Sequence, residues 1–276
     1  MISWAAENVK PKHVTTRDVL GSLFLMTVPP LFVHILTFAL RDERINGSLY
    51  KLLDFVMKQG PVPSVKAFFP SIEEIQEGSY YVVMFGFIQF LLMWIVPGHE
   101  HKGPIAPSGH VPVYKANGVQ CFLLTIVLWA VGAYLQLFPA GWQYTYAPGM
   151  FAFLNISALL LCVGLYFKGR FAPSTADAGH SGNFIFDMFW GTELYPRFGH
   201  SVWPIGWDVK LWTNCRFGIM YWGLSGLSYA AAQYTQTGAV SDSMIVSALV
   251  QVSVRAHFFY FFIQHPENLS FQGEIK

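Results

Sequence analysis

The sequence predicts an all-α protein, a polytopic bundle of helices that cross a membrane. Hydrophobic residues make up 53% of the 276 residues, charged residues make up only 12%, and the mean hydropathy is +0.39. Soluble domains carry about twice that share of charged residues. Apolar runs near the length that spans a bilayer, about 20 residues, recur six times along the chain.

The first three runs lie in the N-terminal half. Residues 19–40 form the first run, and it contains Pro29 and Pro30, which membrane helices tolerate although they kink the helix. Residues 80–96 form a short but uncharged second run, and residues 119–138 form the third. We expect all three runs to span the membrane.

The remaining three runs bring the expected number of spans to six. Residues 148–167 form the fourth run. The fifth, residues 217–234, is rich in Gly, Ser and Ala, the small residues that let membrane helices approach closely. Residues 244–263 form the sixth. We therefore expect one membrane bundle over residues 1–263, followed by a divergent tail at residues 264–276.

The distribution of Lys and Arg gives an orientation. Eleven of these residues fall in the N-terminal tail, in the second and fourth loops and in the C-terminal tail, whereas five fall in the first loop. Cytoplasmic loops carry the excess of Lys and Arg in multi-pass proteins. We therefore expect a cytoplasmic N-terminus and a cytoplasmic fourth loop at residues 168–216.

Composition and spacing exclude several classes of function. The net charge of +1 gives no field that would attract nucleic acid. The three cysteines have unrelated spacings, and the histidines near residue 100 have no third ligand at a fixed spacing, so we expect no metal site. The chain has no P-loop and no glycine fingerprint of a soluble dinucleotide-binding domain.

The fourth loop contains a charged and aromatic stretch, GNFIFDMFWGTELYPRFG, at residues 182–199. Glycines and a proline divide it, so its central segment makes at most two helical turns. The candidate site residues here are Asp187, Glu193 and Arg197. An interfacial loop with solvated charges is one interpretation, and a polar pocket at the membrane surface is the other.

A second polar stretch, GWDVKLWTNCRFG, lies at the mouth of the fifth span. Its candidate residues are Lys210, Asn214 and Arg216. An arginine at a membrane edge is most often an anchor whose long side chain reaches the interface. A functional role at the mouth of the bundle is the alternative. We interpret His34, in the first span, as a buried histidine with its hydrogen bonds satisfied.

The stretch at residues 182–199 resembles the first motif of the sterol reductase family, G-N-x-x-x-D-x-x-x-G-x-E-L-x-P-R. The segments WDVKLWTNCRFG, GPIAPSGHVPVYKANG, KGRFAPSTADAGHSGN and SDSMIV resemble further segments of that family, and their details fit its Δ7 branch. The resemblance covers roughly residues 80–250. It implies a multi-pass enzyme of the endoplasmic reticulum membrane.

The resemblance also implies a reaction and its partners. It implies sterol biosynthesis, in which NADPH reduces the C7–C8 double bond of a sterol, with the lipid membrane and other sterol-pathway enzymes as partners. The cofactor-binding residues of the family lie in a C-terminal half beyond Lys276, so the resemblance implies a C-terminally truncated chain. Reduction of the Δ14 or Δ24(28) double bond, or a truncated protein that binds sterol without turnover, are the alternatives. A transporter is less well supported.

Overall fold

The computed structural model describes residues 14–102, 111, 113–173, 179–193 and 212–264, and for His101, Val113, Tyr114, Asn214, Cys215 and residues 255–264 only the backbone. The helices are α2 (Thr16–Arg41), α3 (Leu49–Gln59), α4 (Pro61–Phe68), α5 (Ile72–Ile95), α6 (Gly118–Tyr134), α7 (Trp142–Thr145), α8 (Ala147–Phe171), α9 (Phe184–Trp190), the π-helix η1 (Trp212–Gly218), α11 (Ile219–Thr237) and α12 (Asp242–Gln264). Two short strands, β1 (His99–Lys102) and β2 (Val113–Ala116), pair antiparallel.

The predicted all-α membrane class is confirmed, because long apolar helices build nearly all of the described fold. Three segments are long and apolar enough to cross a membrane: Thr16–Arg41, Pro61–Ile95 and Ala147–Phe171. Gly118–Tyr134 and Asp242–Val254 are apolar but shorter. Helix α11 is less apolar because Ser, Thr, Gln and Tyr residues interrupt it.

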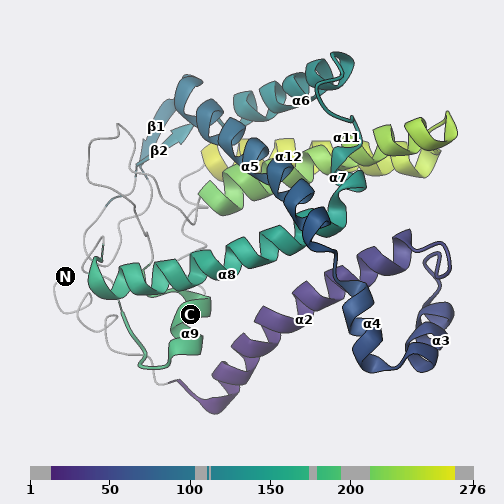
Figure 1. Cartoon of the computed structure of the whole chain (residues 1–276). Coiled ribbons are helices and arrows are strands. Elements are labelled where there is room, and N and C mark those ends of the chain that lie inside the picture. Colours follow the sequence, from purple (N-terminus) through teal and green to yellow (C-terminus); the bar gives the residue numbers. More distant parts are fainter. Residues whose placement is uncertain (1–13, 103–110, 112, 174–178, 194–211, 265–276) are drawn as a thin grey trace.

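The long helices run back and forth between two ends of the bundle (Figure 1). One end, here called the α9 end, carries α9 and the β1–β2 ribbon. The other, the α3 end, carries α3, α4 and α7. Contacts confirm this order, because Trp190 of α9 reaches Ser22 near the start of α2, whereas Arg41 at the end of α2 reaches Tyr144 of α7.

Two features differ from the expectations from sequence. The second long helix begins at Ile72, eight residues before the expected span, because Ser71 and Glu74 form a reciprocal capping box. Residues 41–79, which we expected to be a loop, contain α3 and α4. Phe38 of α2 holds both, with ring centroids 5.4 Å from Phe55 and 5.2 Å from Phe68.

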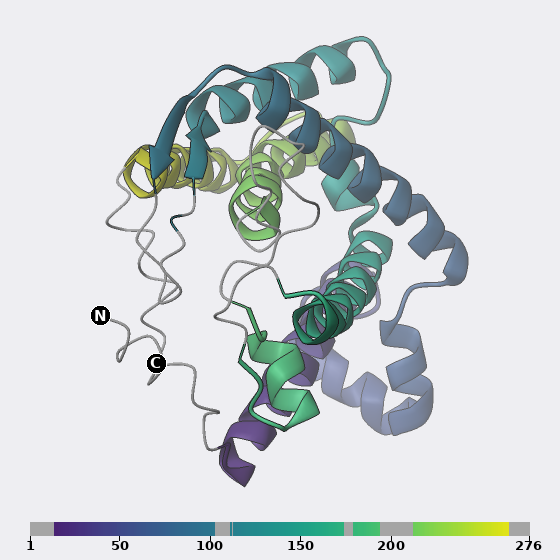
Figure 2. The same ribbon diagram turned by 90° about the vertical axis from the view of Figure 1, so that its left-hand side faces the viewer.

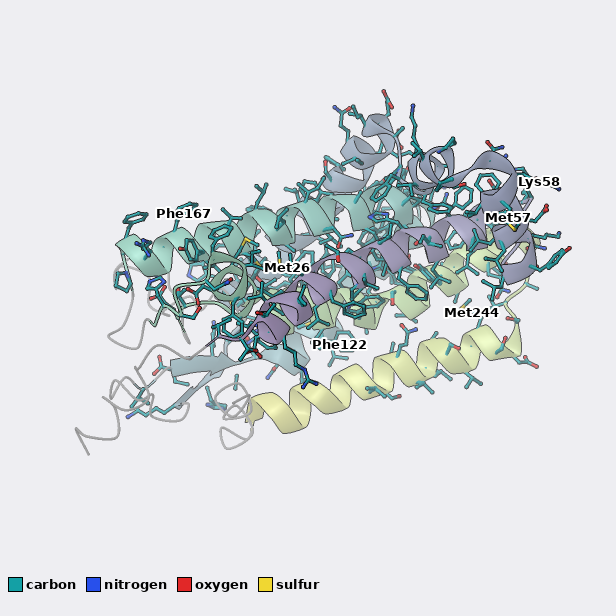
Figure 3. All side chains as sticks on the ribbon, turned by 90° about the horizontal axis from the view of Figure 1, so that it is seen from below. Met26, Met57, Lys58, Phe122, Phe167 and Met244 are labelled. Carbon is teal, nitrogen blue, oxygen red and sulfur yellow. The ribbon has the colours of Figure 1, made fainter. Side chains whose placement is uncertain are left out.

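Aromatic side chains form the centre of the core. Tyr81 of α5 stacks on Trp142 of α7 and on Tyr146, at centroid distances of 5.6 and 4.4 Å. Phe85 lies 5.9 Å from Tyr221 of α11. Rings at these separations attract one another beyond the burial of their area, so this group ties α5, α7 and α11 together. Phe122, labelled in Figure 3, is enclosed, whereas Phe167 on the outside of α8 is exposed.

Helices α5 and α8 make the closest backbone contact. A Cβ atom added to Gly149 would overlap the carbonyl oxygen of Glu74, and one added to Gly78 would overlap the backbone of Met150. Glycine at both positions therefore lets the two backbones meet, as small residues do in membrane bundles. By contrast, Gly164 of α8 has open space around it.

This contact generates a test of the packing. We expect Gly149→Ala to destabilise the protein by about 1–3 kcal/mol, because the added methyl group forces the two backbones apart. Gly164→Ala, the matched control on the same helix, should leave stability unchanged or slightly raised, since Ala favours a helix. Thermal unfolding in lipid nanodiscs measures both variants. Equal midpoints would contradict the close contact.

Candidate functional site

Helix α9 forms from the motif stretch because its two ends are well defined. The side chain of Asn183 caps the helix by accepting a hydrogen bond from the backbone N–H of Phe186, at 3.1 Å. Gly191 ends it with a φ of 80°, a conformation that favours glycine. The helix has seven residues, within the two turns expected. It places Asp187 on its inner side.

Asp187 is buried and takes part in a local network. Its two carboxylate oxygens accept hydrogen bonds from the backbone N–H of Ser181, at 3.0 and 3.1 Å. The ring nitrogen Nδ1 of His180 lies 3.9 Å from the same carboxylate. The interpretation of Asp187 as a solvated charge is therefore wrong, since only 5% of the residue is exposed.

Glu193 is also buried, and it forms an ion pair with Lys168. The Lys168 Nζ atom lies 2.8 Å from Glu193 Oε2, and the side chains are 11% and 2% exposed. Gly169 makes this approach possible, because a Cβ atom there would overlap the hydroxyl of Thr192. The last turns of α8 therefore hold the segment that follows α9.

Helix α2 completes this polar face. The indole Nε1 of Trp190 donates to the hydroxyl of Ser22, at 3.0 Å, and thereby fastens α9 to α2. The polar face thus consists of side chains from α2, α8, α9 and the segments flanking α9. Its charged groups are paired or hydrogen-bonded locally, which is how charge becomes tolerable when it is removed from water.

Arg216 belongs to a second cluster, around the β1–β2 ribbon. It is buried in η1, and its guanidinium donates to the backbone carbonyl of Lys115, at 2.7 Å. Lys115 in turn donates to the carbonyl of Trp94, at 2.9 Å, and Asn117 donates to that of Val96, at 2.7 Å. The snorkelling interpretation of Arg216 is wrong, because its side chain points into protein.

The remaining candidates cannot be placed in either cluster. Arg197 and Lys210 lie outside the described residues, and the side chain of Asn214 in η1 does as well. The structure thus brings Asp187 and Glu193 to the polar face and gives Arg216 other partners. In the sequence, Lys168 and Lys115 contribute only to the orientation. The position of Lys168 immediately after the fourth apolar run was the available signal for it.

An apolar cavity lies between the helices. It has a volume of about 790 Å³ and is lined by residues of α2, α5, α8, η1 and α11. Figure 2 views α8 and α11 nearly end-on, with α5 running past both. The lining is mostly aliphatic and aromatic, and the volume falls in the range of small-molecule sites. The cavity therefore fits a rigid apolar ligand with few polar groups.

Comparisons with known proteins give a consistent result. The model of the ergosterol biosynthesis ERG4/ERG24 family matches residues 20–265. The 7-dehydrocholesterol reductase of Arabidopsis thaliana is 33% identical over 263 residues, which are 92% of this chain and 56% of the relative. The 7-dehydrocholesterol reductase of Xenopus laevis is 32% identical over 66% of this chain and 38% of the relative.

A relative with another specificity matches as well. The Δ14-sterol reductase of Ascobolus immersus is 24% identical over 84% of this chain and 54% of the relative. The chain thus spans about half the length, or less, of these relatives.

The buried pair generates a prediction about stability. We expect Glu193→Gln to cost about 3–5 kcal/mol, because it leaves the charge of Lys168 without its buried counter-ion. The double variant Lys168→Met/Glu193→Leu should recover most of that loss, because it removes both charges.

The matched control is the exposed pair of Lys58 and Asp54 on α3, which are 2.7 Å apart. Asp54→Asn should cost less than about 1 kcal/mol, as expected for a surface pair. Denaturant unfolding in nanodiscs measures all three variants. A loss for Glu193→Gln no larger than that for Asp54→Asn would show that the pair at the polar face is solvated.

Proposed function

The chain belongs to the ergosterol biosynthesis ERG4/ERG24 family, and from this membership we propose that it acts in sterol biosynthesis as an NADPH-dependent reductase of the sterol C7–C8 double bond. The names of the Arabidopsis and Xenopus relatives support the Δ7 specificity. The single structural observation that carries the proposal is the apolar cavity between α5, α8, η1 and α11.

The cavity suits the chemistry of such a reduction. A carbon–carbon double bond is reduced when a proton reaches one carbon and a hydride reaches the other. Positive charge develops on the carbon that accepts the hydride, so water must be kept away from it. The lining is mostly apolar, with Phe87, Phe217 and Tyr221 among its aromatic residues, and such a lining suits fused hydrocarbon rings. NADPH supplies the hydride in this scheme.

The buried cations Lys168 and Arg216 do not by themselves form a site for NADPH. A dinucleotide phosphate needs cationic side chains or free backbone N–H groups. On the polar face, the charge of Lys168 is already balanced by Glu193. In the second cluster, Arg216 donates to a backbone carbonyl. We therefore assign none of these residues to the cofactor, and no step of the reduction is drawn through them.

The proposal includes a location. A multi-pass protein whose apolar cavity lies among its spans takes its ligand from the bilayer. We place the chain in the endoplasmic reticulum membrane with its N-terminus in the cytoplasm, where the α9 end and its polar face would meet a soluble cofactor. The excess of Lys and Arg in the loops of that end supports this orientation.

Sterol profiling tests the reaction. Membranes from a host that lacks Δ7- and Δ14-sterol reductase activity, expressing the chain, are supplied with NADPH and either a 5,7-diene or an 8,14-diene sterol. We expect loss of the 5,7-diene with gain of the Δ5 product. Reduction of the 8,14-diene alone would replace the Δ7 assignment with the Δ14 activity of the Ascobolus relative. Saturable sterol binding without reduction would favour a non-catalytic sterol-binding protein.

A cavity-filling variant tests the site. Ala158→Trp places a large ring in the lining contributed by α8, and we expect it to weaken sterol binding about tenfold or more, since overpacking costs about 1–3 kcal/mol. Leu160→Trp is the matched control, because Leu160 is exposed on the same helix and does not line the cavity. Equal binding by the two variants would place the sterol elsewhere.

A further inference from the structure

One side chain gives the apolar cavity a polar anchor. Most of the lining is aliphatic or aromatic, but Asn155 of α8 contributes a carboxamide at the edge next to α2. Asn155 is half-buried and lies eight residues after the start of α8, within its apolar run. A carboxamide facing hydrocarbon is costly unless it finds hydrogen-bond partners.

Among the residues that the structure describes, Asn155 has one hydrogen-bond partner. Its Nδ2 atom lies 3.2 Å from Nε2 of His34 on α2. His34 is only 4% exposed, and its ring packs on Phe69 with centroids 4.8 Å apart. A carboxamide nitrogen can only donate, so we assign Nε2 of His34 as the acceptor in this contact, with the proton of the neutral ring on Nδ1.

That assignment leaves an acceptor for a ligand. With Nδ2 committed to His34, the carbonyl oxygen Oδ1 of Asn155 remains, and it can only accept a hydrogen bond. The two residues differ in their surroundings. His34 is buried and does not line this cavity, whereas Asn155 does. A contact that served only to join α2 to α8 would not require the amide to lie in the cavity wall.

The cavity is also long enough for an elongated ligand. Its α8 lining extends from Phe151 to Leu161, which at the helical rise of about 1.5 Å per residue corresponds to about 15 Å. Asn155 lies toward the Phe151 end of this wall. A rigid ligand with one hydroxyl group at an end could therefore place that group at Asn155 and its apolar body along the rest of α8.

On the basis of the proposed function, we infer that Asn155 is the specificity residue for the hydroxyl group of the sterol, which donates a hydrogen bond to Oδ1. His34 is its positioning residue, because it holds the amide with Oδ1 free. The pair thereby distinguishes a sterol alcohol from an apolar hydrocarbon of the same shape.

Binding selectivity tests the inference. The chain in nanodiscs is titrated with a 3-hydroxy sterol and with its 3-deoxy analogue, and the ratio of the two affinities is measured. One neutral hydrogen bond is worth about 0.5–1.5 kcal/mol, so we expect a preference for the alcohol of about threefold to tenfold. Asn155→Leu should abolish this preference while the 3-deoxy analogue still binds, which also shows that the variant is folded.

Three further variants separate recognition of the hydroxyl group from packing. Ser157→Ala changes another polar residue of the cavity lining and should keep the preference. His34→Leu should reduce it, because the Asn155 amide can then rotate. His34→Gln should restore part of it, because its amide oxygen can accept from Nδ2.

Each outcome has a distinct meaning. A wild-type chain that binds neither sterol overturns the proposed function and this inference with it. Sterol binding with an unchanged ratio in Asn155→Leu overturns only the inference. Equal loss of both ligands in that variant would make the Asn155–His34 contact a link between helices and would likewise overturn it.

Discussion

The rest of the bundle depends on the backbone contact between α5 and α8. Gly78 and Gly149 let the two helices meet without side chains between them. This contact fixes both the spacing and the axial register of the pair. Helix α8 carries the cavity wall at its middle and Lys168 at its end, so the position of both is set relative to α5. The aromatic core adds α7 and α11 to this pair.

A second constraint is the removal of charge from water at the α9 end. Asp187, Glu193 and Arg216 are all buried, yet each has a different local partner. The resulting cap is held by backbone groups as much as by opposite charges. Movement of this cap would cost free energy, because each charge would lose its partner. The described part of the motif stretch, residues 182–193, thus packs onto the end of the bundle as well as carrying candidate site residues.

Hydropathy was enough to predict the class and the positions of the long helices, because the bilayer requires about 20 apolar residues per span. It could not predict the start of α5, which a capping box at Ser71 determines, nor α3 and α4, which Phe38 holds in place. Burial of the site charges could not be predicted either. It depends on Gly169, which lets Thr192 approach α8, and neither hydropathy nor the motif indicates that these two segments are in contact.

The π-helix η1 has a consequence for how the sequence can change. A π-turn contains more residues than an α-turn, and each residue added or removed rotates everything beyond it by about 100°. Trp212 at the start of η1 and Tyr221 beyond its end both line the cavity. The number of residues between Trp212 and Tyr221 therefore determines whether both side chains face the cavity, whatever residues stand between them. Substitutions within η1 change chemistry, but a single insertion or deletion there would turn one wall of the cavity away from the other.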